Sequence, residues 1–442
     1  MEILLPALLP FAFIGASLWL GFVHQRRRLR AWQDAAVACG LQNVESPGRS
    51  ELSAQAGPVS VKIDAYGDKG TRIVVSVPGP PDFHRVSIRR EPLVGSGRET
   101  EIGDPAFDST FLIEGPARLV FALLDAKTRR LLLDVNTASR LEILNGTLQA
   151  EHLADSKIPH VLPLLIDIAR QLAQPMDVPQ RLTESAHRDP VAKVRFQILR
   201  LLIRELPGAA WTLEALRTAC SDPSPEIRLL AARNLGTEGR GVLLDLAESL
   251  VGDIVSAEAV SALDRGLPVE RARAILTGAL RRRHIQTARA CLKALGKSDD
   301  AAAVGPLVEV MEQERDDLAI AAALALKATG SPAAEPPLIR ALRRRQLRAA
   351  AANALGRVGS VAAVLPLKEA AKRFWLDLDF QGPARQAIAE IQSRLPGASP
   401  GQLSLSGAEE GQLSLAQAEA GQLSLAAPTT GQAGQLSLPP ES

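Results

Sequence analysis

A helical pattern with one apolar face recurs along the C-terminal half of this chain. It is plainest over residues 221–239, where apolar residues follow Ile227 at the i+3, i+4 and i+8 positions of one helical face. Asp222 is suited to cap that helix, Pro223 to stand in its first turn, and Gly236 to end it. One helix pair cannot bury such a face alone, so the unit is expected to stack on copies of itself.

Equivalent leucines mark the repeat at intervals of about 30 residues. The markers are Leu202, Leu235, Leu263, Leu295, Leu326, Leu355 and, less regularly, Ile388. Four residues before each marker stands a mostly small residue, as close helix packing requires: Ile198, Ala231, Ala259, Cys291, Ala322, Ala351 and Ala384. The sequence therefore predicts a mainly α fold with a solenoid of about seven helix pairs over residues 158–395.

Two of these repeats share a further signature. Asp189-Pro190 and Asp222-Pro223 stand at the same distance before their markers, and Arg195 and Arg228 follow at the same offset. This DPxxx[VI]R register resembles the HEAT-like repeats of the phycobilin-lyase type. The resemblance implies an armadillo-like α-solenoid with a concave face that binds partner proteins. It implies no reaction, because the same stack serves lyases, DNA-binding enzymes and pure scaffolds.

Before the repeats, residues 3–23 form an apolar run without a charge, about long enough to cross a hydrocarbon core of roughly 30 Å. We expect a single transmembrane helix there. Arginines follow the run closely, at positions 26, 27, 28 and 30, and the positive-inside rule then places the bulk of the chain in the cytoplasm.

Residues 25–157 predict a small α+β domain. Apolar residues alternate over 59–63, 73–77 and 86–88, as in strands, with a hairpin turn over 66–70. Helical spacing returns over 118–133. Asn145-Gly146 between apolar residues is then a strong hairpin signal.

This domain also contains the motif Gly103-Asp104-Pro105-Ala106-Phe107-Asp108, followed by Phe111 and Gly115. It is similar to a GDPxFDxxFxVxG pattern of uncharacterised bacterial proteins with an N-terminal membrane helix, and it implies no known activity. Asp104 and Asp108 form a possible paired-carboxylate or metal site. The structural interpretation is favoured, because Asp-Pro initiates turns and both phenylalanines suit the core. With the apolar run, the resemblance indicates a single-pass protein of the bacterial inner membrane.

Composition narrows the function classes. The net charge is +2 and aromatic residues make up 3%, which gives no global field for nucleic acid and few rings for base stacking. Three widely spaced cysteines, Cys39, Cys220 and Cys291, favour a reducing compartment. The histidines lack metal-ligand spacing; the nearest candidates are His152, Asp155 and His160. No catalytic signature occurs in the sequence, so we expect no enzyme, cofactor or metal.

Two basic clusters are the candidate partner-binding residues. They are the triplets Arg281, Arg282, Arg283 and Arg343, Arg344, Arg345, which lie at similar distances before their markers and so share one edge of the solenoid. A phosphate-binding or nucleic-acid-binding ridge is one interpretation. Glu312, Glu314, Asp316 and Asp317 occupy the same edge in the intervening repeat, however. Salt bridges between repeats are therefore the favoured interpretation.

Residues 396–442 form a low-complexity tail in which GQLSL recurs from Gly401, Gly411, Gly421 and Gly434. Its composition predicts disorder. QLSL resembles the pentapeptide with which bacterial replication proteins dock on the sliding clamp, but the terminal aromatic residue is missing here. Repeat expansion without function, or multivalent docking in one shallow groove, are the alternatives.

Together these features favour a membrane-tethered cytoplasmic scaffold or adaptor that binds a partner protein through its solenoid. The alternative from another class is a HEAT-type enzyme or a nucleic-acid or phosphate binder that uses the arginine edge.

Overall fold

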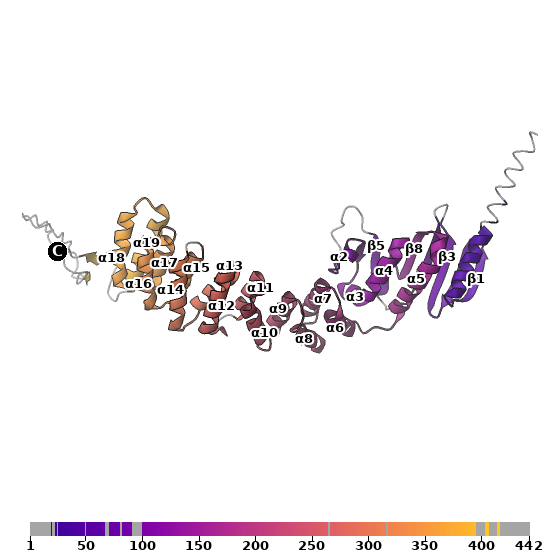
Figure 1. Ribbon diagram of the computed structural model, residues 1–442, viewed down its shortest axis with the longest axis horizontal. Helices are drawn as coiled ribbons and strands as arrows, with labels where there is room; N and C mark the ends of the chain where they lie inside the picture. The colour runs from indigo at the N-terminus through magenta and orange to yellow at the C-terminus, as the bar shows by residue number, and fades with distance from the viewer. Residues whose placement is uncertain are drawn as a thin grey trace, which may run out of the picture. The chain divides into compact units, whose positions relative to one another are not determined.

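The computed structural model describes residues 19, 23, 25–48, 50–66, 70–79, 82–90, 100–263, 266–314, 317–394, 403–405 and 413–415. The chain divides into two compact units, residues 1–263 and 264–442 (Figure 1), and each is described by itself. In the described residues the fold is mainly helical, and the one large sheet comes before the helix pairs in the chain.

The sheet of the first unit has eight antiparallel strands in the order β1-β2-β3-β4-β8-β7-β5-β6. The strands are β1 (Gln42–Gly48), β2 (Glu51–Ala56), β3 (Val59–Ala65), β4 (Thr71–Ser76), β5 (Ser87–Arg90), β6 (Phe111–Glu114), β7 (Arg140–Leu144) and β8 (Thr147–Leu153). Burial alternates along β2, β3, β4 and β7, as expected where only one face of a sheet is packed.

The predicted strands and hairpins of this domain are confirmed. Apolar alternation located β3, β4 and β5, and the backbone N–H of Tyr66 bonds the carbonyl of Gly70 at 2.9 Å across the predicted turn. Asn145 (φ 51°) and Gly146 (φ 76°) form the tight turn between β7 and β8. Three strands were not predicted: β1, whose residues are mostly exposed, β2, and the short β6, which follows the GDPxFD motif.

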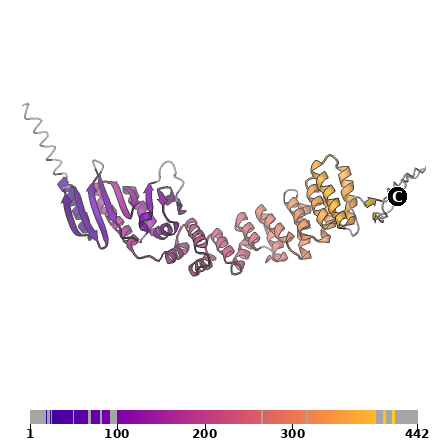
Figure 2. The ribbon, with the colours of Figure 1, turned by 180° about the vertical axis from the view of Figure 1, so that it is seen from behind.

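Helices cover one face of the sheet (Figures 1 and 2), namely a helix over residues 25–38, α4 (Ala126–Ala138) and α5 (Ile158–Ala173). The single helix predicted over 118–133 was wrong. It is two helices, α3 (Ala117–Leu123) and α4, because Asp125 caps a new helix by accepting the N–H of Thr128.

One further helix, α5, begins directly after the predicted domain boundary at residues 157/158. Helix α5 contacts β3, β4 and β8, so its apolar face belongs to the core of the sheet domain. The stacked helix pairs begin after it, with α6.

The first unit contains three helix pairs. They are α6 (Val178–Arg188) with α7 (Ala192–Glu205), α8 (Ala210–Ala219) with α9 (Pro225–Asn234), and α10 (Arg240–Ser249) with α11 (Asp253–Leu263). The expectation that Asp222 and Pro223 begin α9 was wrong by two residues. Ser224 is the N-cap and Pro225 the first helical residue, because the Asp222 carboxylate is engaged elsewhere.

The second unit contains four pairs. They are α12 (Val269–Arg282) with α13 (Ile285–Gly296), α14 (Val304–Gln313) with α15 (Asp317–Thr329), α16 (Glu335–Ala341) with α17 (Arg348–Val358), and α18 (Val364–Arg373) with α19 (Leu378–Ser393). The described residues thus hold seven pairs, as predicted. All seven residues four positions before the markers are at most 1% exposed, which confirms the repeat register.

Two predictions fall largely outside the described residues. Residues 3–23 do so except for Trp19 and Val23, and among the residues that are described no helix has the length and apolar character to cross a bilayer. Of the tail, only β9 (Leu403–Leu405) and β10 (Leu413–Leu415) are described, and they pair antiparallel.

Candidate functional site

The GDPxFD pattern docks the sheet domain on the first helix pair. Gly103 has φ +98°, and a Cβ there would lie 2.9 Å from Cγ of Lys193 on α7, so glycine permits both the turn and the approach. Asp108 accepts the backbone N–H of Ile102 and Gly103 at 3.1 and 2.8 Å. Burial raises the pKa of Asp108, although these N–H groups oppose it. The structural interpretation of this carboxylate therefore holds.

The second carboxylate of the pattern, Asp104, belongs to a buried ion cluster around Arg129. The Arg129 side chain is 2% exposed and donates to Asp104 at 2.9 Å, to both oxygens of Asp189 at 2.9 and 3.1 Å, and to the Leu124 carbonyl. Asp189, whose side chain is 1% exposed, also accepts the N–H of Val191. A cation of the sheet domain thus neutralises the first repeat's signature aspartate.

A similar buried ion pair joins the first helix pair to the second. Arg195 donates to both oxygens of Asp222 at 2.8 Å and to the carbonyl of Asp189 at 2.7 Å. Burial acts to raise the pKa of Asp222, but Arg195 and the N–H of Ser224 outweigh it and hold that pKa below its ordinary value. At the next position Nε of Arg228 is buried without a hydrogen-bond partner.

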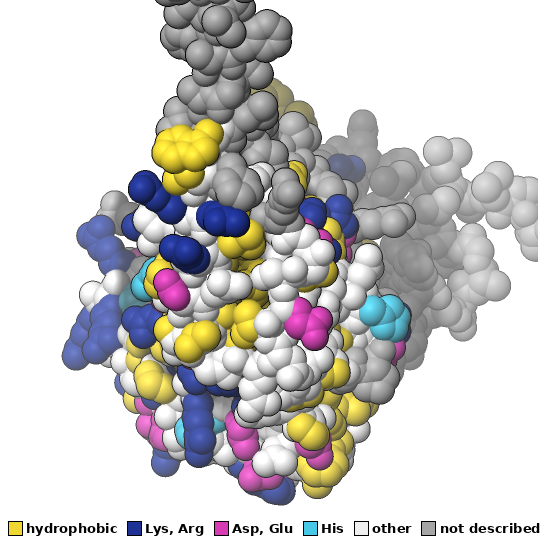
Figure 3. All heavy atoms as spheres, turned by 90° about the vertical axis from the view of Figure 1, so that its right-hand side faces the viewer, with side chains coloured by type: hydrophobic (Ala, Val, Ile, Leu, Met, Phe, Trp, Pro, Cys, Tyr) yellow, Lys and Arg dark blue, Asp and Glu magenta, His cyan; other side chains and the backbone are white. Residues whose placement is uncertain are grey.

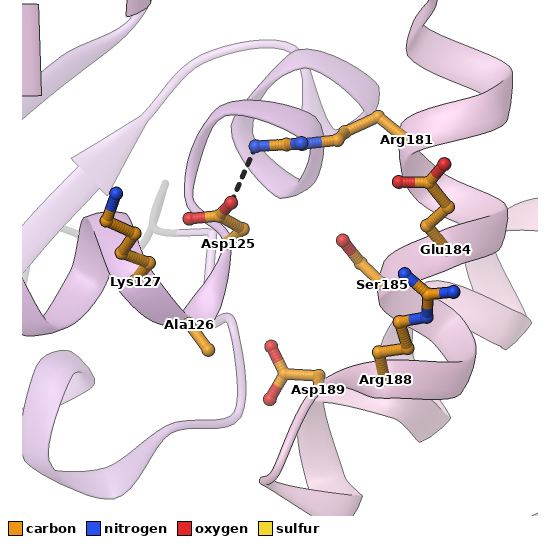
Figure 4. A pocket seen from close by; sticks show the side chains of 8 residues that line it. All are labelled: Asp125, Ala126, Lys127, Arg181, Glu184, Ser185, Arg188 and Asp189. Atoms are coloured by element: carbon orange, nitrogen blue, oxygen red, sulfur yellow. Dashed lines mark hydrogen bonds and ion pairs between the residues drawn. The ribbon is translucent and has the colours of Figure 1, made fainter. Parts of the chain in front are cut away.

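A pocket opens above this cluster, between the start of α4 and helix α6 (Figure 4). We call it the α4–α6 pocket. It has a volume of about 180 Å³ and is lined by Asp125, Ala126, Lys127, Arg181, Glu184, Ser185, Arg188 and Asp189. Figure 4 shows the Ser185 hydroxyl and the Asp189 carboxylate facing the open space, with Arg181 bound to Asp125 at 2.6 Å across the upper rim.

The six arginines of the predicted edge differ in their surroundings: five are exposed and one is half-buried. Arg281, Arg282 and Arg283 end α12 and are exposed, as are Arg343 and Arg345 after α16. Arg344 is half-buried, because its guanidinium donates to the carbonyls of Met311 and Glu314 at the end of α14. Arg340, outside the triplet, forms the inter-repeat salt bridge to Glu312 at 2.7 Å. Partner binding by the six arginines stays a prediction.

Two apolar surfaces in the second unit were not predicted. Trp375 and Leu376, between α18 and α19, and Leu378, the first residue of α19, are 68%, 73% and 83% exposed, and we call these three residues the apolar patch. A groove of about 350 Å³ also runs between α13 and α15. Its lining is Arg289, Leu292, Lys293, Gly296, Lys297, Ala321, Leu324, Ala325 and Ala328.

The other candidate residues have structural partners. Asp155 accepts from Arg28, Trp32 and Thr71, and His152 packs edge-on against Tyr66. Within the described ranges no cluster of three or more His, Cys, Asp or Glu residues could hold a metal ion. Burial raises the pKa of Cys291 to about 12, which agrees with its predicted packing role.

Sequence reasoning missed Arg129 and Ser185. A signal for Arg129 existed, since it stands three residues before Leu132 and six before Val135, on the buried face of α4. Ser185 offered none, because a serine within a helix is usually solvated and its pocket is formed by residues about 60 positions apart.

A match to a family model agrees with the repeat assignment for part of the second unit. A family model described as PBS lyase HEAT-like repeat matches residues 318–344 and 347–373. A search of curated proteins found no match. Among solved structures, human deoxyhypusine hydroxylase in complex with glycerol is similar at 16% sequence identity and a TM-score of 0.22, over 49% of this chain and 96% of that chain. The matched residues span α15 to α18, so this part of the second unit consists of HEAT-like repeats.

Proposed function

We propose that this chain is a scaffold that is tethered to the bacterial inner membrane and holds a partner protein on its helical repeats in the cytoplasm. The observation that carries the proposal is the apolar patch, where Trp375, Leu376 and Leu378 are all at least 68% exposed. Contiguous large apolar side chains on a surface mark interaction sites, and tryptophan is enriched among residues that dominate binding energy.

The groove between α13 and α15 supports the same function. Its floor is apolar, with Leu324 47% exposed, and three basic side chains line its rim, Arg289, Lys293 and Lys297. An apolar floor with a charged rim is the usual anatomy of a protein interface.

The tether rests on the sequence of residues 3–23 and on the basic residues after it. Arg26, Arg27 and Arg30 are exposed at the start of the helix over 25–38, and Arg28 binds Asp155 at 3.0 Å. Figure 3 shows Lys and Arg side chains gathered on the upper part of this face of the molecule. Basic residues that follow an apolar run favour the cytoplasmic side of a membrane.

Partner binding is tested by photo-crosslinking in the host from residue 375 of the full-length chain. We expect a defined crosslinked band, which Leu378→Ala weakens. A photo-crosslinker at Trp211, which is 44% exposed on α8, is the matched control. The same band from both positions, or a band that Leu378→Ala leaves unchanged, would contradict partner binding at the patch.

Topology is tested by adding protease to intact spheroplasts. Residues after Arg30 should remain whole until the membrane is lysed. Degradation of the repeats from outside would contradict the proposed orientation.

A further inference from the structure

We propose that the α4–α6 pocket binds a single carboxylate group, from a small organic acid or from an acidic side chain of a peptide. The proposal does not rest on the scaffold function, because the pocket lies in the first unit and the apolar patch in the second.

The first argument is the Ser185 hydroxyl. Ser185 is only 8% exposed, and its side chain points into the open space of the pocket (Figure 4). No group in the described part of the chain accepts from this hydroxyl or donates to it. The oxygen itself is open to the pocket, so its hydrogen-bonding capacity is available to a ligand.

The second argument is the number of donors around the hydroxyl that have no acceptor. Nε of Arg181 is buried and unpartnered. Helix α4 presents its first turn here, and among the described residues nothing accepts the backbone N–H groups of Ala126 and Lys127. The side chains of Lys127 and Arg188 likewise have no ion-pair partner within those residues. First-turn N–H groups and nearby cations together favour an anion.

The third argument is that the acceptors lining the pocket are already engaged. Asp125 binds Arg181 and the N–H of Thr128. Both oxygens of Asp189 accept from Arg129. Glu184 accepts from Gln180 at 3.2 Å and is exposed. The free hydrogen-bonding capacity of the pocket is therefore almost entirely of the donor kind, which a ligand with acceptor oxygens satisfies.

Size and charge narrow the class of anion. The lining carries three basic side chains, Lys127, Arg181 and Arg188, and three acidic ones, Asp125, Glu184 and Asp189. Arg181 and Asp125 form one ion pair, and Arg129 below the pocket is shared by Asp189 and Asp104. With Arg129 and Asp104 included, four cations stand against four carboxylates, so the surroundings carry no excess charge. A carboxylate, which brings one negative charge, is therefore easier to accommodate than a phosphate dianion, and about 180 Å³ suits a small group.

The experiment is calorimetric titration of the purified full-length chain at constant ionic strength. The probes are sodium acetate, the peptide N-acetyl-Gly-Glu-Gly-amide and inorganic phosphate, with sodium chloride as the blank. We expect acetate to bind, with Ser185→Ala weakening it about two- to tenfold, as for the loss of one hydrogen bond. Arg188→Gln should weaken it about ten- to a hundredfold, as for a charge-assisted bond.

Arg130→Gln is the matched control, because Arg130 is an exposed arginine of α4 that does not line the pocket. It should leave binding unchanged. Peptide binding at least as tight as acetate binding supports an acidic side chain as the natural ligand, and acetate binding alone supports a small free acid. Absence of acetate binding, equal binding by the Ser185→Ala, Arg188→Gln and Arg130→Gln variants, or tighter binding of phosphate overturns the proposal.

Discussion

Removal of the Arg129 side chain should be among the most destabilising changes in the first unit. Arg129→Met deletes four hydrogen bonds, to Asp104, to the Leu124 carbonyl and to both oxygens of Asp189. Asp104 is 16% exposed and can gain water, but Asp189, at 1%, retains only the N–H of Val191. Breaking such a buried pair from one side costs about 3–5 kcal/mol. At about 2–4 °C per kcal/mol for a unit of this size, the melting temperature should fall by ~6–20 °C.

Arg217→Met is the control for this change. Arg217 and Glu238 form an ion pair at 2.9 Å in which both side chains are 56% exposed, so its loss should leave the melting temperature almost unchanged. The double variant Arg129→Met, Asp189→Leu should recover most of the loss, because no charge is then left buried without a partner. Thermal unfolding of the full-length chain measures all three variants. A shift for Arg129→Met no larger than that for Arg217→Met would refute the reasoning.

Three further predictions concern the stability and chemistry of single residues. Leu295→Asp, which buries an unpaired carboxylate, should strongly lower the melting temperature of the second unit, and Ser298→Asp in the adjoining loop should change it little; equal shifts would show that the repeat register is wrong. Because the pKa of Asp222 is lowered in the folded state, its contribution to stability is complete at neutral pH and is lost as the pH falls through that lowered pKa. Asp222→Asn should therefore flatten the acid limb of urea-unfolding curves, and parallel pH profiles would argue against the pairing. At pH 8 Cys291 should resist alkylation in the native chain while half-buried Cys39 reacts first, by mass spectrometry; rapid labelling of Cys291 would contradict its burial.

The repeat register could be predicted from sequence because it depends on local periodicity. A small residue four positions before each leucine lies on the same helical face, whatever the rest of the chain does. Hairpin turns such as Asn145-Gly146 were equally local. Strand β1 could not be found this way, because a strand that pairs with one neighbour and stays exposed carries no apolar alternation.

The ends of the elements depended on long-range partners. Asp222 has the composition of a helix cap, yet Arg195 from the preceding pair engages its carboxylate, so the helix begins two residues later. The α4–α6 pocket is also a product of long-range contacts, since Asp125 and Ser185 meet only after the sheet domain docks on α6. Neither residue has a sequence neighbour that would indicate a ligand.

The series of buried Arg–Asp ion pairs between successive repeats ends at Arg228, whose Nε has no hydrogen-bond partner. Two buried ion pairs of fixed geometry, Arg129 with Asp189 and Arg195 with Asp222, connect the sheet domain to the first two helix pairs. Helices α9 and α11 pack against each other, and the exposed ion pair of Arg233 with Glu258 at 2.8 Å joins them. Helices that meet through apolar contacts can slide against each other far more easily than helices joined by bidentate hydrogen bonds. We therefore expect a mechanical load on this unit to bend it near that junction, where a groove of about 470 Å³ is lined by residues of α9, α10 and α11.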